Sequence, residues 1–239
     1  IYGINAVAEA IRAGRVRQIR VAGRDDERLR RVLDEAAAGG VTVVHVHRDA
    51  LERDARGGVH QGIVADITAR PDSTLADLIH GDRGTPLIVV LDGVEDPHNV
   101  GAILRTVDAA GASGVVRQTR RAAPLDGAAA KASAGAVHHV AVADVVNIAR
   151  ALENLKDLGV WSVGLDAHSE KPYYELDLTV PTAVVVGAEG HGLRRLVRER
   201  CDFVAAIPMA GRVSSLNVSA AAAIVLFEAV RQRRSRGRP

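Results

Sequence analysis

Residues 86–110 read PLIVVLDGVEDPHNVGAILRTVDAA, and the first part of this stretch is a continuous apolar run. Such a run is typical of a strand that is buried on both faces of a parallel sheet. We expect a helix to follow it up to Ala110, because Asp96 is a good N-cap residue, Pro97 a good first helical residue and Gly111 a good stop. A buried strand that leads into a helix indicates an α/β unit.

The same alternation continues to the end of the chain. Further strands are expected at residues 115–117, 137–142, 160–165, 183–186 and 204–207, and helices at residues 145–158, 193–200 and 216–233. Alternating strands and helices predict a mostly parallel sheet that is covered by helices on both faces. In sheets of this kind ligands bind beyond the carboxyl ends of the strands.

A second, smaller α/β unit is expected at residues 1–67. Helices are predicted at residues 6–13 and 25–38, and strands at residues 18–22, 41–46 and 61–67. Residues 68–84 contain Pro71, Gly81, Gly84 and several Asp, so they are interpreted as a linker with a short helix at 75–79. The predicted organisation is therefore a small domain, a linker and a larger domain at residues 85–239.

Composition excludes several classes of protein. The 239 residues are 47% apolar, but no apolar run is long enough to cross a bilayer, and no signal-peptide pattern stands at the start. Cys201 is the only cysteine, which excludes an internal disulfide and a multi-cysteine zinc site and fits a reducing cytoplasm. His45, His47, His138 and His139 lack a convergent carboxylate or cysteine, so no metal site is expected.

The net charge of +2 is weak support for a nucleic-acid partner, but the arginines are unevenly distributed. They gather near the two ends of the chain, at Arg12, Arg15, Arg17, Arg20 and Arg24 and at Arg231, Arg233, Arg234, Arg236 and Arg238. We expect an arginine-rich face of residues 1–67 to hold RNA.

Polar residues follow the strand at 86–91. Asn99 and Arg105 lie on the predicted helix six residues apart, which places them roughly 9 Å apart along its axis. That spacing would allow the two side chains to bracket a nucleotide. The alternative is that Asn99 supports the helix cap and that Arg105 is a solvated surface charge.

A second polar segment, VVVGAEGHGL at residues 184–193, follows a predicted strand. Its glycines allow backbone N–H groups to approach a ligand closely. Their spacing is not that of the dinucleotide fingerprint, and no acidic residue about twenty positions on is placed to bind a ribose. A different adenosyl ligand stays open, with Glu189 either in the site or only capping the next helix.

The third segment, AGRVSSLNVSAAAAIVLFEAV at residues 210–230, places small polar residues before an apolar helix. Ser215 is interpreted as the helix cap, whereas Asn217 and Ser219 have no such structural role in this interpretation. The alanines at 220–223 would admit a flat ligand or a second backbone, although tight core packing explains them equally well. We interpret this helix entrance as the lining of a ligand pocket.

These segments together resemble a known family. DPHNVGAILRTVDAAG, VVVGAEGHGLRRL and IPMAGRVSSLNVSAAAAIVLFEAVRQR are similar, in order and spacing, to motifs 1, 2 and 3 of the SpoU/TrmH RNA ribose 2'-O-methyltransferases. The N-terminal IYGINAVAEAIRAG resembles the start of the small RNA-binding domain of the bacterial ribosomal-RNA members. The type that it resembles most is the large-subunit rRNA guanosine-2'-O-methyltransferase.

The resemblance implies a SPOUT fold with a deep trefoil knot near the C-terminus, S-adenosylmethionine as cofactor, ribosomal RNA as substrate, and a homodimer without a metal or a membrane anchor. By position, the cofactor-binding residues would be Gly187, Glu189, Gly190, Ile207, Met209 and Leu216. The active-site residues would be Asn99, Arg105, Glu189, Ser215 and Asn217. A guanidinium is very hard to deprotonate, so we expect Arg105 to clamp a phosphate and stabilise the developing alkoxide.

The chain departs from the family pattern at Gln118 and Thr119, where a Pro-Lys-like pair is expected after the strand. Alternative functions are a tRNA ribose 2'-O-methyltransferase, a resistance-type rRNA methylase and a non-catalytic RNA-binding SPOUT protein. The five intact active-site positions argue against the last alternative.

Overall fold

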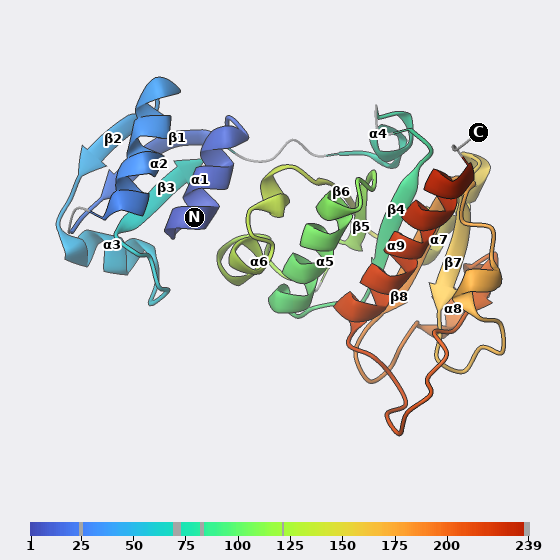
Figure 1. The fold of residues 1–239 in the computed structure, drawn as a ribbon. Coiled ribbons are helices and arrows are strands. Elements are labelled where there is room, and N and C mark those ends of the chain that lie inside the picture. The colour runs from blue at the N-terminus through green and yellow to red at the C-terminus, as the bar shows by residue number, and fades with distance from the viewer. Residues whose placement is uncertain (24–25, 69–72, 82–83, 121, 237–239) are drawn as a thin grey trace.

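The computed structural model describes residues 1–23, 26–68, 73–81, 84–120 and 122–236. Its backbone forms two α/β units that lie side by side, with the N-terminus in the smaller unit and the end of the last helix in the larger one (Figure 1). Arg24 and Arg238, which were counted among the clustered arginines, lie outside the described residues.

The smaller unit is built on a three-stranded sheet. Its strands, in the order β2-β1-β3, are β2 (Thr42–His45), β1 (Val16–Val21) and β3 (Ile63–Ile67). β1 pairs with β2 in parallel and with β3 antiparallel. α1 (Ile4–Arg12) and α2 (Glu27–Ala38) bury one face of the sheet, and α3 (Arg48–Asp54) packs on the other face through the fully buried Leu51. The sequence did not predict α3, whose seven residues are mostly charged.

The larger unit contains a six-stranded sheet in which every pairing is parallel. In the order of the sheet, the strands are β6 (Ala141–Val145), β5 (Gly114–Gln118), β4 (Leu87–Asp92), β8 (Thr182–Gly187), β7 (Trp161–Leu165) and β9 (Phe203–Ala205). β4 is completely buried, as its apolar sequence predicts.

Helices cover both faces of this sheet, so the predicted three-layer α/β architecture is confirmed. α5 (Pro97–Ala109), α6 (Gly127–Ala132) and α9 (Val218–Arg236) pack on one face, together with the 3₁₀ turn η1 (Ala136–His138). α4 (Leu75–His80), α7 (Ile148–Asp157) and α8 (Arg195–Arg200) pack on the other. A second 3₁₀ turn, η2 (Tyr173–Glu175), lies beside α9. Among the described residues, no helix has the length and hydropathy needed to cross a bilayer.

The direction in which strands are added to the sheet changes between β4 and β8. From β4 the chain builds β5 and β6 on one side, and β7, β8 and β9 all lie on the other. At the carboxyl ends, Asp92 of β4 lies in register with Gly187 of β8. In open parallel sheets this point, where the strand order reverses, is the usual ligand site.

One predicted strand is partly wrong. Residues 137–142 were expected to be extended, but residues 136–138 form η1 and the strand begins at Ala141. The Ser133 hydroxyl accepts a hydrogen bond from the backbone N–H of Val137, so this segment continues the turn that follows α6. α6 itself was not predicted, because its short sequence GAAAKA carries no clear periodicity.

The last helix was also misplaced at its start. It begins at Val218 instead of residue 216, and it continues to Arg236. The other predicted elements match the structure apart from shifts of one to three residues at their ends. For example, α7 begins at Ile148 because Asn147 caps it, accepting a hydrogen bond from the Arg150 N–H at 3.1 Å.

Candidate active site

Three side chains from the three polar segments meet beyond the ends of β4 and β8. Asn99 Nδ2 donates a hydrogen bond to Glu189 Oε1 at 3.1 Å. Asn217 Nδ2 donates to the same carboxylate oxygen at 2.7 Å and to Asn99 Oδ1 at 2.9 Å. The fold therefore brings together residues that are 90 and 118 positions away from Asn99 in the sequence.

Asn99 is held firmly in place at the start of α5. Asp96 caps this helix by accepting from the His98 N–H at 2.9 Å, as the sequence predicts. The Asn99 residue is only 7% exposed, so its amide needs partners, and Glu189 and Asn217 provide them. Its predicted role as mere support for the cap does not describe these contacts.

Asn217 has a second function, because it is the cap of α9. Its Oδ1 accepts from the Ser219 N–H at 2.9 Å and from the Ser219 hydroxyl, and its carbonyl accepts from the Ala221 N–H at 3.0 Å. The prediction that Ser215 caps this helix is therefore wrong. Ser215 is exposed and lies two residues farther out, on the wall of a cavity.

That cavity has a volume of about 380 Å³ and lies between the segments after β7, β8 and β9. Residues 186–193 form one wall, and parts of the segment 207–218 form another. All the residues predicted to bind the cofactor line it, namely Gly187, Glu189, Gly190, Ile207, Met209 and Leu216. The cavity meets the Asn99–Glu189–Asn217 cluster at Glu189, which belongs to both.

Gly187 is required by the packing of the local backbone, apart from any contact with a ligand. A Cβ at this position would lie 2.1 Å from the carbonyl carbon of Gly192 and 2.4 Å from the backbone nitrogen of Leu193. The glycine therefore lets the segment fold back on itself, with the Gly192 N–H donating to the Ala188 carbonyl at 2.9 Å. Close approach of a ligand is not needed to explain it.

Arg105 lies two turns beyond Asn99 on α5, and its side chain is exposed. It has no hydrogen bond or ion pair to the residues that the structure describes, and it does not line the cavity. A cation in this position is available for a group that arrives from solvent, such as a phosphate.

An ion pair that the sequence did not reveal anchors the glycine-rich segment. Asp92 is completely buried and accepts two hydrogen bonds from Arg194, from the backbone N–H at 2.7 Å and from Nε at 2.6 Å. The charged side chains also form an ion pair, with Arg194 Nη2 lying 2.5 Å from Asp92 Oδ1. The same guanidinium donates to Gln118 Oε1 at 2.9 Å. Gln118, the departure from the family pattern, thus contributes to a clamp that joins β4, β5 and the start of α8.

The loop after β7 was also missed as part of the site. Asp166 and His168 line the cavity. Both follow β7, the strand next to β8, and this position could have indicated that they belong to the site. Burial raises the pKa of Asp166, but hydrogen bonds from the His168 N–H and from Arg198, together with the charge of Arg198, outweigh it and lower the pKa. Asp166 is therefore a carboxylate at neutral pH.

These features fit a small ligand with an apolar part and a positively charged group. The cavity falls in the usual size range of small-molecule sites, and Val186, Ile207 and Met209 provide apolar walls. Backbone groups of residues 187–193 and the carboxylates of Glu189 and Asp166 provide polar and negative partners. Among the described residues, no group of three or more His, Cys, Asp or Glu is placed to hold a metal ion.

Comparison with known proteins identifies the class. Residues 86–227 match the SpoU rRNA Methylase family, and residues 1–72 match the RNA 2'-O ribose methyltransferase substrate-binding family. The chain belongs to the SpoU rRNA methylase family.

Individual relatives are similar to this chain over almost its whole length. The 23S rRNA (guanosine-2'-O-)-methyltransferase RlmB of Pseudomonas syringae pv. tomato is 44% identical over 100% of this chain and 98% of the relative. The RlmB of Pseudomonas aeruginosa is 46% identical over 98% of this chain and 96% of the relative. Among solved structures, the SpoU methyltransferase AviRb from Streptomyces viridochromogenes in complex with AdoMet superposes with a TM-score of 0.82 at 28% identity, covering 98% of this chain and 90% of that one.

Proposed function

We propose that this protein transfers a methyl group from S-adenosylmethionine to the ribose 2'-hydroxyl of a guanosine in 23S ribosomal RNA. Relatives that are named as 23S rRNA (guanosine-2'-O-)-methyltransferases match almost the entire chain at 44–46% identity. The observation that carries the proposal is the Asn99–Glu189–Asn217 cluster, because three separate motifs converge at the mouth of a cavity of suitable size.

The cofactor would occupy the cavity between β8 and the segment 207–218. When bound, S-adenosylmethionine supplies a methyl group on a positively charged sulfur, which is already activated for transfer. Ile207, Met209 and Leu216 would contact its apolar parts, the backbone at Gly187 and Gly190 its polar parts, and Glu189 lies at the point where the cavity meets the cluster. Positioning then provides much of the rate enhancement.

The catalytic group would comprise Asn99, Arg105, Glu189, Ser215 and Asn217. The two amides and the carboxylate hold one another in a fixed arrangement, which costs no reorganisation when the RNA arrives. Arg105, with no protein partner among the described residues, would bind the phosphate beside the reacting nucleotide and stabilise negative charge that develops on the 2'-oxygen.

We also propose a separate function for each part of the chain. Residues 1–67 would bind the RNA substrate and residues 85–239 would carry the chemistry. Residues 68–84 would connect the two, although α4 within them packs on the sheet of the larger unit. The match of residues 1–72 to a substrate-binding family supports this division, and the two separate sheets are consistent with it. Three of the clustered arginines are engaged within the protein, however: Arg12 with Glu35, Arg15 with His138, and Arg20 with Asp66.

Three further features are parts of the same proposal. A homodimer is supported by the large apolar side chain of Phe227 on α9, which remains exposed. The trefoil knot and the cytoplasmic location are properties that the family resemblance implies, and they stay predictions.

The decisive experiment is mass-spectrometric mapping of ribose methylation on RNA from cells with and without the gene. We expect one 2'-O-methylguanosine of 23S rRNA to disappear on deletion and to return when the wild-type gene is restored. Loss of a methyl group from tRNA, or from a nucleotide other than guanosine, would support the corresponding alternative. Unchanged methylation, together with no affinity for the cofactor in calorimetry, would indicate a non-catalytic RNA-binding protein.

A further inference from the structure

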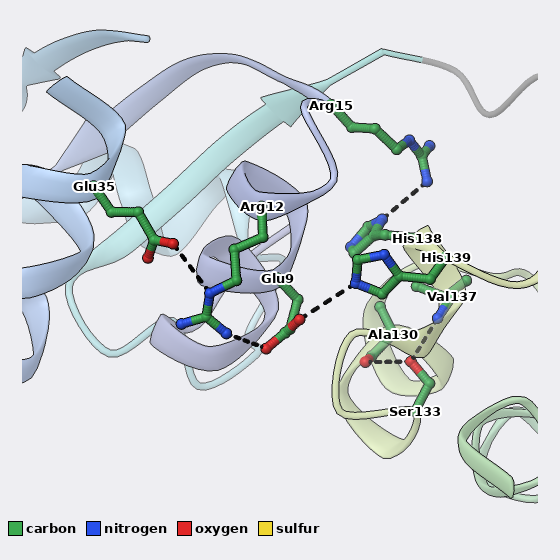
Figure 2. A network of polar contacts seen from close by, with 9 residues as sticks. All are labelled: Glu9, Arg12, Arg15, Glu35, Ala130, Ser133, Val137, His138 and His139. Carbon is green, nitrogen blue, oxygen red and sulfur yellow. Dashed lines mark hydrogen bonds and ion pairs between the residues drawn. The ribbon is translucent and has the colours of Figure 1, made fainter. Parts of the chain in front are cut away.

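The two α/β units touch through a compact set of polar contacts. Figure 2 shows the α1 segment facing the turn that contains His138 and His139. Arg15 Nη1 lies 2.9 Å from His138 Nδ1, and His139 Nε2 lies 3.3 Å from Glu9 Oε2. Arg15 also donates through Nη2 to the Thr68 carbonyl at 2.9 Å, so it joins the small sheet, the start of the linker and the large unit.

The side chain of Glu9 is pre-positioned for its contact. Arg12 Nη1 donates to Glu9 Oε1 at 2.5 Å, and Arg12 Nε donates to Glu35 Oε1 at 3.0 Å (Figure 2). The guanidinium therefore ties Glu9 of α1 to α2 and leaves the other oxygen of Glu9 directed to His139. Arg12 and Arg15, which the sequence suggested as RNA contacts, stabilise this arrangement of the two units.

The surfaces approach so closely that a side chain would not fit between them. A Cβ at Gly135, where φ is +92°, would lie 2.2 Å from the Cβ of Glu9. The small unit thus packs directly against the segment 127–139 of the large unit, which includes α6 and η1.

This segment connects the contact to the catalytic helix. A Cβ at Gly101 of α5 would lie 2.6 Å from the Ala129 carbonyl oxygen and 2.6 Å from the Ala132 Cβ, so α6 lies directly on α5. Ser133 joins α6 to η1, because its hydroxyl donates to the Ala130 carbonyl at 2.8 Å and accepts from the Val137 N–H at 3.3 Å (Figure 2). A continuous packed path therefore runs from Glu9 and Arg15 to the helix that carries Asn99 and Arg105.

We propose that Glu9, Arg15, His138 and His139 are positioning residues, which fix the RNA-binding unit relative to α5 so that bound RNA presents its target ribose to Arg105. This inference rests on the proposed function. Two domains joined by a linker move relative to each other by default when the interface between them is small. A specific contact is therefore needed to fix their relative orientation. A misplacement of about 1 Å at the reacting centre can lower the rate about a hundredfold.

A positioning role and direct RNA binding predict different effects of mutation: the first lowers the rate of methyl transfer, and the second lowers the affinity for RNA. Arg15→Ala and His138→Ala should leave the affinities for rRNA and for S-adenosylmethionine within about twofold of wild type. The single-turnover rate at saturating RNA should fall about tenfold or more in each variant. Because both changes break the same contact, the double variant should be little slower than either single one.

A distance measurement tests the docking independently of activity. Spin labels at Asp34→Cys on α2 and Asp157→Cys on α7, both exposed, would report the separation of the two units. The native Cys201 should react much more slowly with the label than the two introduced cysteines, because burial raises the pKa of its thiol to about 12. We expect a narrow distance distribution in the labelled parent protein and a broad one after Arg15→Ala, whereas Arg31→Ala, which removes an exposed pair with Glu27, should leave it narrow.

Three results would overturn the inference: wild-type single-turnover rates in the contact variants, slower rates without a broader distance distribution, or a loss of RNA affinity that accounts for the slower rates. The last of these would mean that Arg15 contacts RNA directly. If the wild-type protein does not methylate rRNA at all, the proposed function fails, whereas the distance distributions still report whether these residues dock the two units.

Discussion

Asn217 donates its side-chain amide to Asn99 at 2.9 Å across 118 positions of sequence, and the same amide nitrogen donates to Glu189. One side chain thus ties the start of α9 to the start of α5 and to the glycine-rich segment after β8. Because Asn217 also caps α9, the geometry of the candidate site and the placement of the last helix depend on the same residue.

This double role leads to a prediction that separates the two functions. Asn217→Ser should keep the helix cap, since Ser and Asn are equally good at that position. It should still lose the amide donor and therefore slow methyl transfer about tenfold or more. Asn217→Ala should lose both functions and destabilise the protein by about 1 kcal/mol as well. Chemical denaturation and single-turnover kinetics on the two variants provide the test, and a fully active Asn217→Ser protein would contradict the catalytic role.

Arg105 is predicted to act on the RNA and not on the cofactor. Arg105→Ala should lower the rate of methyl transfer about a hundredfold or more and leave the calorimetric affinity for S-adenosylmethionine unchanged, because the side chain does not line the cavity. Arg150→Ala is a suitable control, since Arg150 is an exposed arginine on α7, on the opposite face of the sheet. Equal activities of the two variants would remove Arg105 from the proposed site.

The neighbours Arg194 and Arg195 should differ greatly in importance. Arg194→Ala leaves the buried carboxylate of Asp92 without its cation, which typically costs about 3 kcal/mol, and it frees the glycine-rich segment at one end. Arg195 is 89% exposed in its side chain and contacts Glu199 only at 3.7 Å, so Arg195→Ala should change stability by less than about 0.5 kcal/mol. Urea denaturation measures the difference, and cofactor affinity should fall only in the Arg194 variant.

The cofactor cavity can be tested by filling it. Ala221 lines the cavity from the first turn of α9, whereas Ala37 is exposed on α2 and does not. Ala221→Leu should weaken S-adenosylmethionine binding about tenfold or more because the added methyl groups occupy ligand space. Ala37→Leu adds the same atoms at an exposed position of the smaller unit and should bind normally. If both variants bind with wild-type affinity in calorimetry, the cofactor lies elsewhere.

Much of the larger fold followed from local sequence. The apolar run at 86–91 and the signals at Asp96, Pro97 and Gly111 predicted β4 and α5 nearly to the residue. These features act over a few neighbouring residues, through burial on both faces and through capping. The segments that lacked such signals, α3 and α6, are short helices whose stability comes from packing on the rest of the protein.

The sequence predicted which residues belong to the candidate site, but not how they contact one another. Polar residues after the strands identified Asn99, Glu189 and Asn217, but not the bonds among them, because these depend on which strands are neighbours in the sheet. The Asp92–Arg194 pair illustrates the same limit: its partners are 102 positions apart and meet only because β4 and β8 are adjacent. Likewise, nothing in the local sequence indicated that Arg15 meets His138 of the other unit.

The assembly prediction rests on the outer side of α9. Its inner stripe of Val218, Ala222, Val225, Leu226 and Ala229 is buried against the sheet and α5. On the outer side Phe227 is 49% exposed and lines a shallow hollow of about 520 Å³, together with Val230, Arg231, Arg234 and Ser235. Two-fold pairing is the commonest way in which proteins cover such a patch, so we expect a homodimer through this side of the helix.

Phe227→Asp should therefore dissociate the dimer. Removing an aromatic side chain from water contributes at least about 1.5 kcal/mol, or about 3 kcal/mol for the two copies, which corresponds to a roughly hundredfold weaker dimer. Leu158→Asp is the matched control, because Leu158 is 44% exposed at the end of α7, on the opposite face of the sheet. Sedimentation at micromolar concentration should give a dimer for the wild type and the control and a monomer for Phe227→Asp. The cofactor should bind more weakly to that monomer, since the first turn of the same helix lines the cavity. A monodisperse, fully active wild-type monomer would rule out this assembly.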